Sequence, residues 1–140
     1  MIAVIRICGN VNIKAGTRET LNRLNLRKKY SCVVLRPVKD RLGMIKRVKD
    51  FVAFGEIKKD VFEKLVKERG QLIDKTKKVE AKKAVEEFEK GKRFEELGLK
   101  PFFRLHPPRG GIDSKKHFGV AKGILGNNKE HINQLIERML

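Results

Sequence analysis

Short apolar runs alternate with helical patterns through the first 57 residues of the chain. Residues 2–7 form a continuous apolar run that only Arg6 interrupts, a pattern typical of a buried strand. Residues 32–35 and 52–57 repeat this pattern, and Pro37 ends the first of them. The pattern therefore predicts three strands.

A helix is expected between each pair of strands. Thr17 is placed to cap the first helix, and the second is expected over residues 41–50. The inner faces would carry Leu21 and Leu24 in the first helix, and Leu42, Ile45 and Val48 in the second. The order strand, helix, strand, helix, strand predicts an α+β fold with a small sheet and both helices on one face.

Residues 58–101 differ in kind, because they hold 14 basic and 10 acidic side chains in close mixture. Apolar residues at helical spacing predict two helices, with a short turn at 94–97. Their apolar positions are Val61, Phe62, Leu65 and Val66, then Ala81, Ala84, Val85 and Phe88. Interspersed lysines and glutamates are typical of solvated helix faces. We interpret this segment as a helical extension with little binding chemistry.

The last segment, 102–140, ends in a helical pattern. Asn127 and Glu130 have the spacing of a capping box. The apolar stripe that follows comprises Ile132, Leu135, Ile136 and Met139. We expect the core at 1–57, the extension at 58–101 and this segment to pack as a single domain.

Residues 104–118 read RLHPPRGGIDSKKHF, which predicts a basic loop. Pro107 and Pro108 stiffen the backbone, and Gly110 and Gly111 allow a tight turn or close approach to a partner. Such a loop is suited to lie along a phosphate chain. The alternative interpretation is an ordinary solvated surface loop.

The formal charge of +17 is unevenly distributed. Residues 1–30 hold seven basic side chains and one acid, and the acid-poor stretches are 14–36 and 104–122. A charge of this size destabilises a small fold unless a polyanion neutralises it, which favours nucleic acid as the partner. An anionic membrane is the rival, but we find neither a basic amphipathic helix nor a membrane-spanning run, so no membrane partner is expected.

Arg27, Lys28 and Lys29 follow the first helix, and either helix capping or nucleic-acid contact explains them. Structured RNA fits better than DNA, because no motif places a helix in a major groove. Phe102 and Phe103 could stack on bases, although the core interpretation is favoured for both, and the two interpretations stay open for His106.

Candidates for metal binding and catalysis are weak. Cys8 and Cys32 lack metal spacing and are interpreted as buried free thiols. His106, His117 and Asp113 could bind a metal, but a solvent-facing or satisfied pair of histidines is favoured. We expect no enzyme, no cofactor and no metal. The absence of a signal peptide in the sequence leads us to expect a cytosolic protein.

Two passages resemble a known family. The phrases LNLRK (24–28) and RLGMIKRV (41–48) resemble the large-subunit ribosomal protein family called L-thirty. The runs HPPRGGIDSKKHF and GNNKEHINQLIERML resemble its longer archaeal members and their eukaryotic relative, called L-seven. The segment 58–101 matches only as the helical extension that separates the long form from the short bacterial form.

The resemblance implies a three-stranded sheet with a central first strand, similar to ferredoxin-like folds, and a structural role in the large ribosomal subunit. It implies that the partners are large-subunit rRNA and neighbouring ribosomal proteins. It places RNA contacts at Lys14, Thr17, Arg18, Arg41, Gly43, Met44 and Lys46 of the core, and at His106, Pro107, Arg109, Gly110, Lys115, Lys116 and His117 of the loop.

The acid-poor stretches add Arg27, Lys28, Lys29, Arg104 and Lys122 to this candidate set. Two alternatives remain: a ribosome-assembly factor of the same family, and an RNA-processing enzyme that uses His106 or His117.

Overall fold

The sheet is built around its first strand. The computed structural model describes residues 1–73 and 80–140. β1 (Ile2–Arg6) lies between β2 (Ser31–Leu35) and β3 (Val52–Glu56), antiparallel to both, with Val4 opposite both Val33 and Phe54. The predicted central first strand and the α+β fold class are confirmed.

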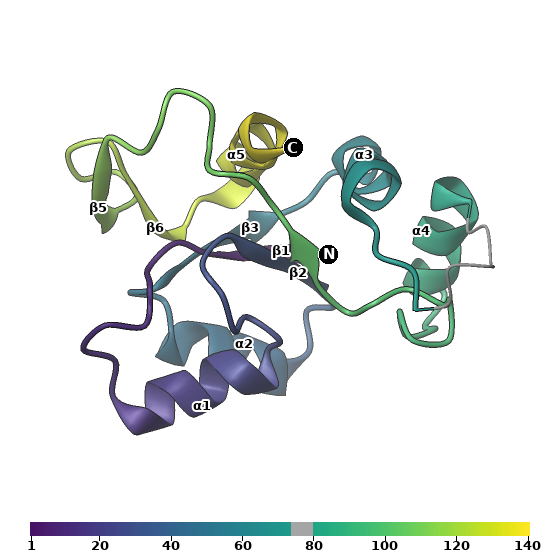
Figure 1. Ribbon diagram of the computed structural model, residues 1–140, viewed down its shortest axis with the longest axis horizontal. Helices are drawn as coiled ribbons and strands as arrows, with labels where there is room; N and C mark the ends of the chain where they lie inside the picture. The colour runs from purple at the N-terminus through teal and green to yellow at the C-terminus, as the bar shows by residue number, and fades with distance from the viewer. Residues whose placement is uncertain (74–79) are drawn as a thin grey trace.

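α1 (Ala15–Arg23) and α2 (Lys39–Arg47) both cover one face of this sheet, as expected (Figure 1). Their apolar faces pack with the sheet in one buried cluster, which includes Val4, Leu21, Leu24, Val33, Ile45 and Val48. Two predicted boundaries are wrong. Lys14, not Thr17, is the N-cap residue, since Thr17 already lies in the first turn, and α2 begins at Lys39 and ends at Arg47.

The sheet is larger than the three strands expected from the sequence. β4 (Phe103–Arg104) adds to β2, β6 (Gly123–Asn127) pairs in parallel with β3, and β5 (Ser114–His117) pairs with β6. The strand order is β4-β2-β1-β3-β6-β5. The prediction that residues 104–118 form a loop throughout is therefore wrong at both ends.

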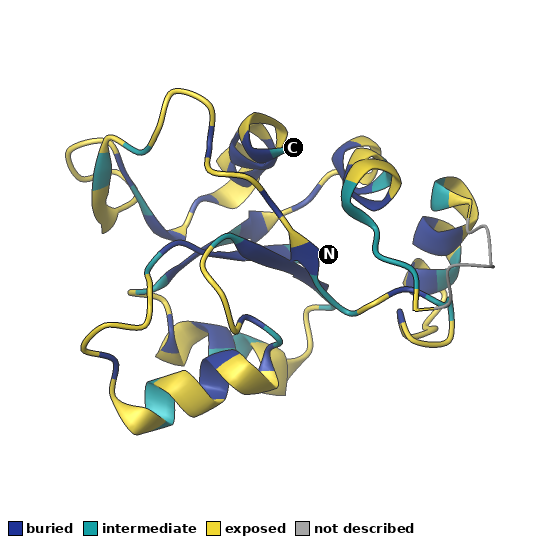
Figure 2. Cartoon of the chain, viewed as in Figure 1, coloured by how far each residue is buried: buried dark blue, intermediate teal, exposed yellow. Residues whose placement is uncertain are grey.

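Three further helices lie away from α1 and α2 (Figure 1). α3 (Lys59–Arg69) and α5 (Ile132–Met139) are on the opposite face of the sheet, and α4 (Ala81–Glu89) lies beside α3. The predicted apolar stripes are confirmed as core, because all of their residues are buried except Ala81, which is half-buried (Figure 2). Residues 74–79 of the predicted extension lie outside the described residues. None of the described helices combines the length and hydropathy that crossing a bilayer requires.

Phenylalanine rings attach the extension to the sheet. Phe88 and Phe94 stack with centroids 4.2 Å apart, and Phe62 and Phe103 meet Phe94 edge-on at 6.1 and 5.7 Å. Phe103 is fully buried, so its predicted core role is confirmed, and Phe102 is half-buried against the α1/α2 cluster. Offset and edge-on ring pairs stabilise beyond the area that they bury.

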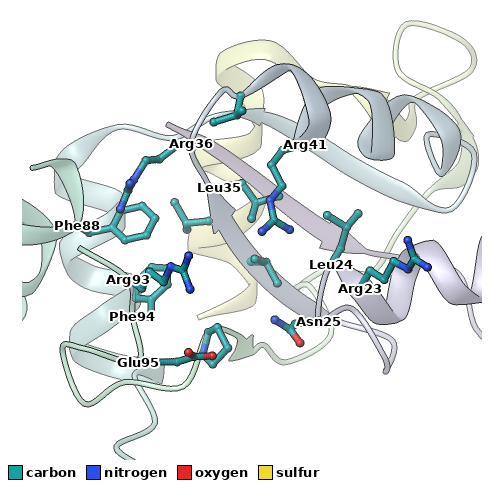
Figure 3. A pocket seen from close by; sticks show the side chains of 14 residues that line it. Arg23, Leu24, Asn25, Leu35, Arg36, Arg41, Phe88, Arg93, Phe94 and Glu95 are labelled. Carbon is teal, nitrogen blue, oxygen red and sulfur yellow. The ribbon is translucent and has the colours of Figure 1, made fainter. Parts of the chain in front are cut away.

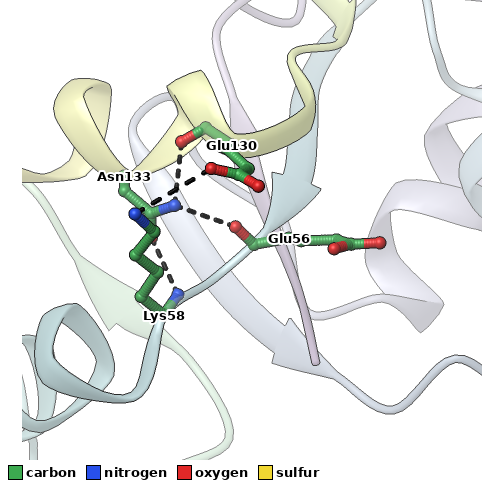
Figure 4. Close-up of polar contacts among 4 residues, drawn as sticks. All are labelled: Glu56, Lys58, Glu130 and Asn133. Atoms are coloured by element: carbon green, nitrogen blue, oxygen red, sulfur yellow. Dashed lines mark hydrogen bonds and ion pairs between the residues drawn. The ribbon is translucent and has the colours of Figure 1, made fainter.

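The capping box predicted at Asn127 and Glu130 is wrong. Asn127 ends β6, and a short 3-10 helix (Lys129–His131) precedes α5. The polar residue that fixes α5 is the buried Asn133, whose amide nitrogen donates to the carbonyls of Glu56 and Glu130 at 3.0 and 2.8 Å (Figure 4). Its amide oxygen accepts from the Lys58 backbone N–H at 2.9 Å, which ties α5 to the β3–α3 connection.

Candidate nucleic-acid interface

A buried arginine organises two loops at one end of the sheet. The Arg6 side chain is 1% exposed, and all five of its N–H donors find acceptors. They bond the carbonyls of Cys8, Gly9, Leu26 and Arg27 and the side-chain oxygen of Asn10, at 2.6–2.9 Å. Burial lowers the pKa of the guanidinium, but it stays charged. Sequence reasoning missed this role, although a lone arginine in an apolar run was the available signal.

The first group of candidate residues gathers where α1 begins and α2 ends. Lys14, Thr17 and Arg18 occupy the start of α1, and Lys46 lies near the end of α2. The two helix ends are neighbours, because a Cβ at Gly16 would lie 2.8 Å from the Arg47 guanidinium. Lys14, Arg18 and Lys46 are exposed.

A second group lies along β2 and β4. Arg27, Lys28 and Lys29 are exposed in the loop that enters β2, beyond the α1 C-cap residue Leu24. This position favours the nucleic-acid interpretation over helix capping. Arg104 is opposite Ser31 in the sheet, and the Leu105 N–H donates to the Tyr30 carbonyl at 3.0 Å. The β2–β4 pairing therefore brings the Arg27–Lys29 loop beside Arg104 and the start of the basic loop.

The basic loop is held against the C-terminal end of α5. The backbone N–H groups of His106 and Arg109 donate to the carbonyls of Met139 and Arg138, at 3.0 and 2.9 Å. The Arg138 guanidinium in turn donates to the carbonyls of Arg109 and Gly111. Gly110 and Gly111 adopt φ of +78° and +75°, so the expected glycine freedom is used here. The side chains of His106, Pro107 and Arg109 remain exposed.

A third group lies on β5 and the turn that follows it. Lys115 and Lys116 are exposed on this edge strand, and Lys122 is exposed in the turn before β6. His117 Nε2 lies 2.9 Å from an oxygen of Asp50, at the end of the α2–β3 connection. His117 is thus partly engaged within the protein, whereas Lys115 and Lys116 are exposed without such a contact in the described structure.

Arg41, Gly43 and Met44 precede Lys46 in α2. Arg41 is in the first turn of α2, at the end away from Lys46, where it borders a groove next to Arg23 at the end of α1. Gly43 is exposed and Met44 is half-buried. The resemblance implies RNA contacts for all of them, and α2 separates Arg41 from Lys46 by five residues.

The candidate cations are largely uncompensated. In the described part of the chain, His117 is the one candidate residue with a carboxylate oxygen within 4.0 Å of a side-chain nitrogen. Ion pairs concentrate instead on the extension and α5, as in Lys59–Glu89 and Lys64–Glu137. Hydrogen bonds to these glutamates raise the pKa of both lysines. Several lysines of the extension therefore have carboxylate partners, whereas in the described structure the lysines and arginines of the candidate groups have none.

Two ring contacts accompany the second group. The Lys29 ammonium lies 4.6 Å from the centroid of the Tyr30 ring, and the Arg104 guanidinium lies 5.9 Å from that of Phe102. Phe118 is 40% exposed, and its ring centroid is 5.3 Å from that of His131.

The cysteines are both free, with Cys32 buried as predicted and Cys8 only half-buried. Burial raises the pKa of the Cys32 thiol to about 12. Within residues 1–73 and 80–140, no three His, Cys, Asp or Glu side chains are grouped to hold a metal ion.

Comparisons with known proteins identify relatives of this chain. A family model described as ribosomal protein L30p/L7e matches residues 2–52. The chain is 37% identical to the large ribosomal subunit protein uL30 of Methanosphaera stadtmanae over 153 residues, which covers 100% of both proteins. It is 39% identical to the uL30 protein of Archaeoglobus fulgidus over 152 residues, which covers 99% of each protein. It is 40% identical to the uL30 protein of Desulfurococcus amylolyticus over 161 residues, which covers 100% of this chain and 98% of the relative.

Proposed function

The chain belongs to the ribosomal protein L30p/L7e family, and from this membership we propose that it binds and stabilises folded large-subunit rRNA. Its relatives are large-subunit ribosomal proteins, so its role is structural and it is not an enzyme. The expected site of action is the cytoplasmic ribosome, where rRNA and neighbouring ribosomal proteins would be its partners.

One observation carries the proposal: the exposed cations of the three groups lack carboxylate partners in the described structure, although the chain has 17 acidic residues. Cations left unpaired on a folded surface repel one another, and phosphates relieve that repulsion with release of counterions. Arginine and lysine would anchor phosphates, the exposed glycines would allow close backbone approach, and His106 could stack on an unpaired base.

Binding of the full chain to large-subunit rRNA over a range of salt concentrations tests this proposal. Affinity should fall steeply as salt rises, and Arg109→Ala and Lys115→Ala should each reduce the salt slope by about one. Lys67→Ala, at an exposed position of α3, is the control and should leave the slope unchanged. An affinity that barely changes over a several-fold rise in salt would refute the proposal.

A ribosome-assembly factor would carry the same surface, and the family membership favours a permanent constituent over it. Washed, mature large subunits separate the two roles. A structural constituent stays in the particle, whereas an assembly factor is lost before maturation.

A further inference from the structure

A groove of about 490 Å³ separates the α1/α2 side of the sheet from the extension (Figure 3). Four arginines from four separate parts of the chain line it: Arg23 at the end of α1, Arg36 after β2, Arg41 in α2 and Arg93 after α4. Among the described residues that line the groove, only Glu95 carries a carboxylate. The proposed function used Arg41 alone of these arginines.

Arg36 is held at the wall of the groove with bonding capacity to spare. Its guanidinium lies 4.9 Å from the centroid of the Phe88 ring and donates to the Lys92 carbonyl. Its Nε is buried and has no acceptor. In the described structure no carboxylate oxygen lies within 4.0 Å of the Arg36 guanidinium, so its charge at the wall of the groove is not neutralised within the protein.

Of the other three arginines, two add charge that no carboxylate of the described structure neutralises. Arg23 pairs with Glu19 at 2.5 Å across one helical turn. Arg41 and Arg93 are exposed, and in the described structure neither lies within 4.0 Å of a carboxylate oxygen. Guanidinium groups present paired donors that match the oxygens of a phosphate group.

We propose that this groove is a second RNA site, which takes the phosphodiester backbone of the rRNA through Arg36, Arg41 and Arg93. The inference rests on the proposed function and deepens it. α2 connects the groove to the first group of candidate residues, because Lys39 and Arg41 lie at one end of the helix and Lys46 and Arg47 at the other. An RNA strand that leaves the groove can therefore continue along a basic helix, which favours RNA over an acidic peptide as the occupant.

The test compares full-length variants that lose equal charge. Arg41→Gln with Arg93→Gln removes two charges from the groove, and Lys67→Gln with Lys82→Gln removes two from the exposed faces of α3 and α4. Lys115→Gln with Lys116→Gln removes two from β5. The salt slope of binding to large-subunit rRNA should fall by about two for the groove pair and for the β5 pair, with the Lys67/Lys82 pair unchanged. Thermal unfolding of each variant verifies that the fold is intact.

The outcomes separate the two proposals. If the wild-type chain does not bind the rRNA, both fail. A second outcome overturns the groove proposal alone. In it, the wild type binds the rRNA and the Lys115/Lys116 double variant binds more weakly, but the Arg41/Arg93 double variant has the same salt slope as the Lys67/Lys82 control. An Arg41/Arg93 double variant that binds rRNA normally but does not assemble into large subunits would overturn the groove proposal as well, because the groove would then bind a protein.

Discussion

At the scale of single residues, Arg6 connects the sheet to the surface where RNA contact is proposed. It lies in the central strand, yet its guanidinium holds the loop at 8–10 and the carbonyls that precede Lys28 and Lys29. Carbonyl and amide oxygens supply all five acceptors, so no carboxylate hydrogen-bonds the Arg6 guanidinium.

Replacing Arg6 with Met should lower the free energy of unfolding by about 3 kcal/mol, because several buried carbonyls lose charged donors at once. Lysine should restore only part of this, since one ammonium cannot reach all five acceptors. Arg18→Met, at an exposed position of α1, should change stability by less than about 0.5 kcal/mol. Urea unfolding measures all three variants, and an Arg6→Met variant as stable as Arg18→Met would contradict the role given to Arg6.

The cysteines provide a second residue-scale prediction. With its pKa raised to about 12, the Cys32 thiol stays protonated at pH 8, and it is also fully buried. Iodoacetamide at that pH should modify Cys8 in the native protein and Cys32 only after denaturant is added. Mass spectrometry of the alkylated peptides reads out both sites. Equal rates of modification in the native protein would show that Cys32 is accessible.

At the scale of elements, the helices were predictable and the added strands were not. The apolar residues at helical spacing are mostly the residues that the fold buries, so the helices can be recognised in the sequence itself. β5 has exposed Lys115, Lys116 and His117 in succession, and β6 contains Gly123 and Gly126. Neither shows the alternation of a half-buried strand, so their pairing depends on tertiary contacts that a sequence pattern does not display.

The candidate site, like the fold, could be predicted only in part from the sequence. The basic stretches at 14–36 and 104–122 were visible as runs of uncompensated charge. The arginine groove was not visible, since Arg23, Arg36 and Arg93 are distant along the chain and meet only when the extension packs beside the sheet. The groove proposal gives the extension a binding residue, Arg93, although its charge pattern alone predicts little binding chemistry.

The docking of the C-terminal elements on β3 depends on one glycine. A Cβ at Gly55 would lie 2.1 Å from the Lys129 carbonyl and 3.1 Å from the Ile132 side chain. Gly55→Ala should therefore destabilise the protein by about 2 kcal/mol. Gly43→Ala is the matched control, because Gly43 is helical with no atom within 4 Å of the added methyl, and it should stabilise by about 0.5–1 kcal/mol. Urea midpoints that shift in the same direction for both variants would contradict this packing.

At the scale of the whole molecule, one buried cluster takes residues from all three segments of the chain. Ile5, Phe62, Phe88, Phe103 and Ile136 belong to it. We therefore propose that 1–57, 58–101 and 102–140 fold as one cooperative unit. Thermal unfolding followed by circular dichroism and by calorimetry should give a single coincident transition. Two separated transitions, with the extension melting first, would contradict a single unit.

The distribution of charge follows from this arrangement. Several lysines of the extension pair with glutamates of the extension or α5, as in Lys59–Glu89 and Lys64–Glu137. The lysines and arginines of the candidate groups have no carboxylate partner in the described structure. The central claim is that these free cations meet the backbone of folded large-subunit rRNA.

Ultraviolet crosslinking of intact large subunits, followed by identification of the nucleotide-bearing peptides of this chain, tests that claim most directly. The account predicts rRNA crosslinks within 14–29 and 104–122. Crosslinks confined to the exposed faces of α3 and α4, or an absence of rRNA crosslinks from this chain in those subunits, would contradict it.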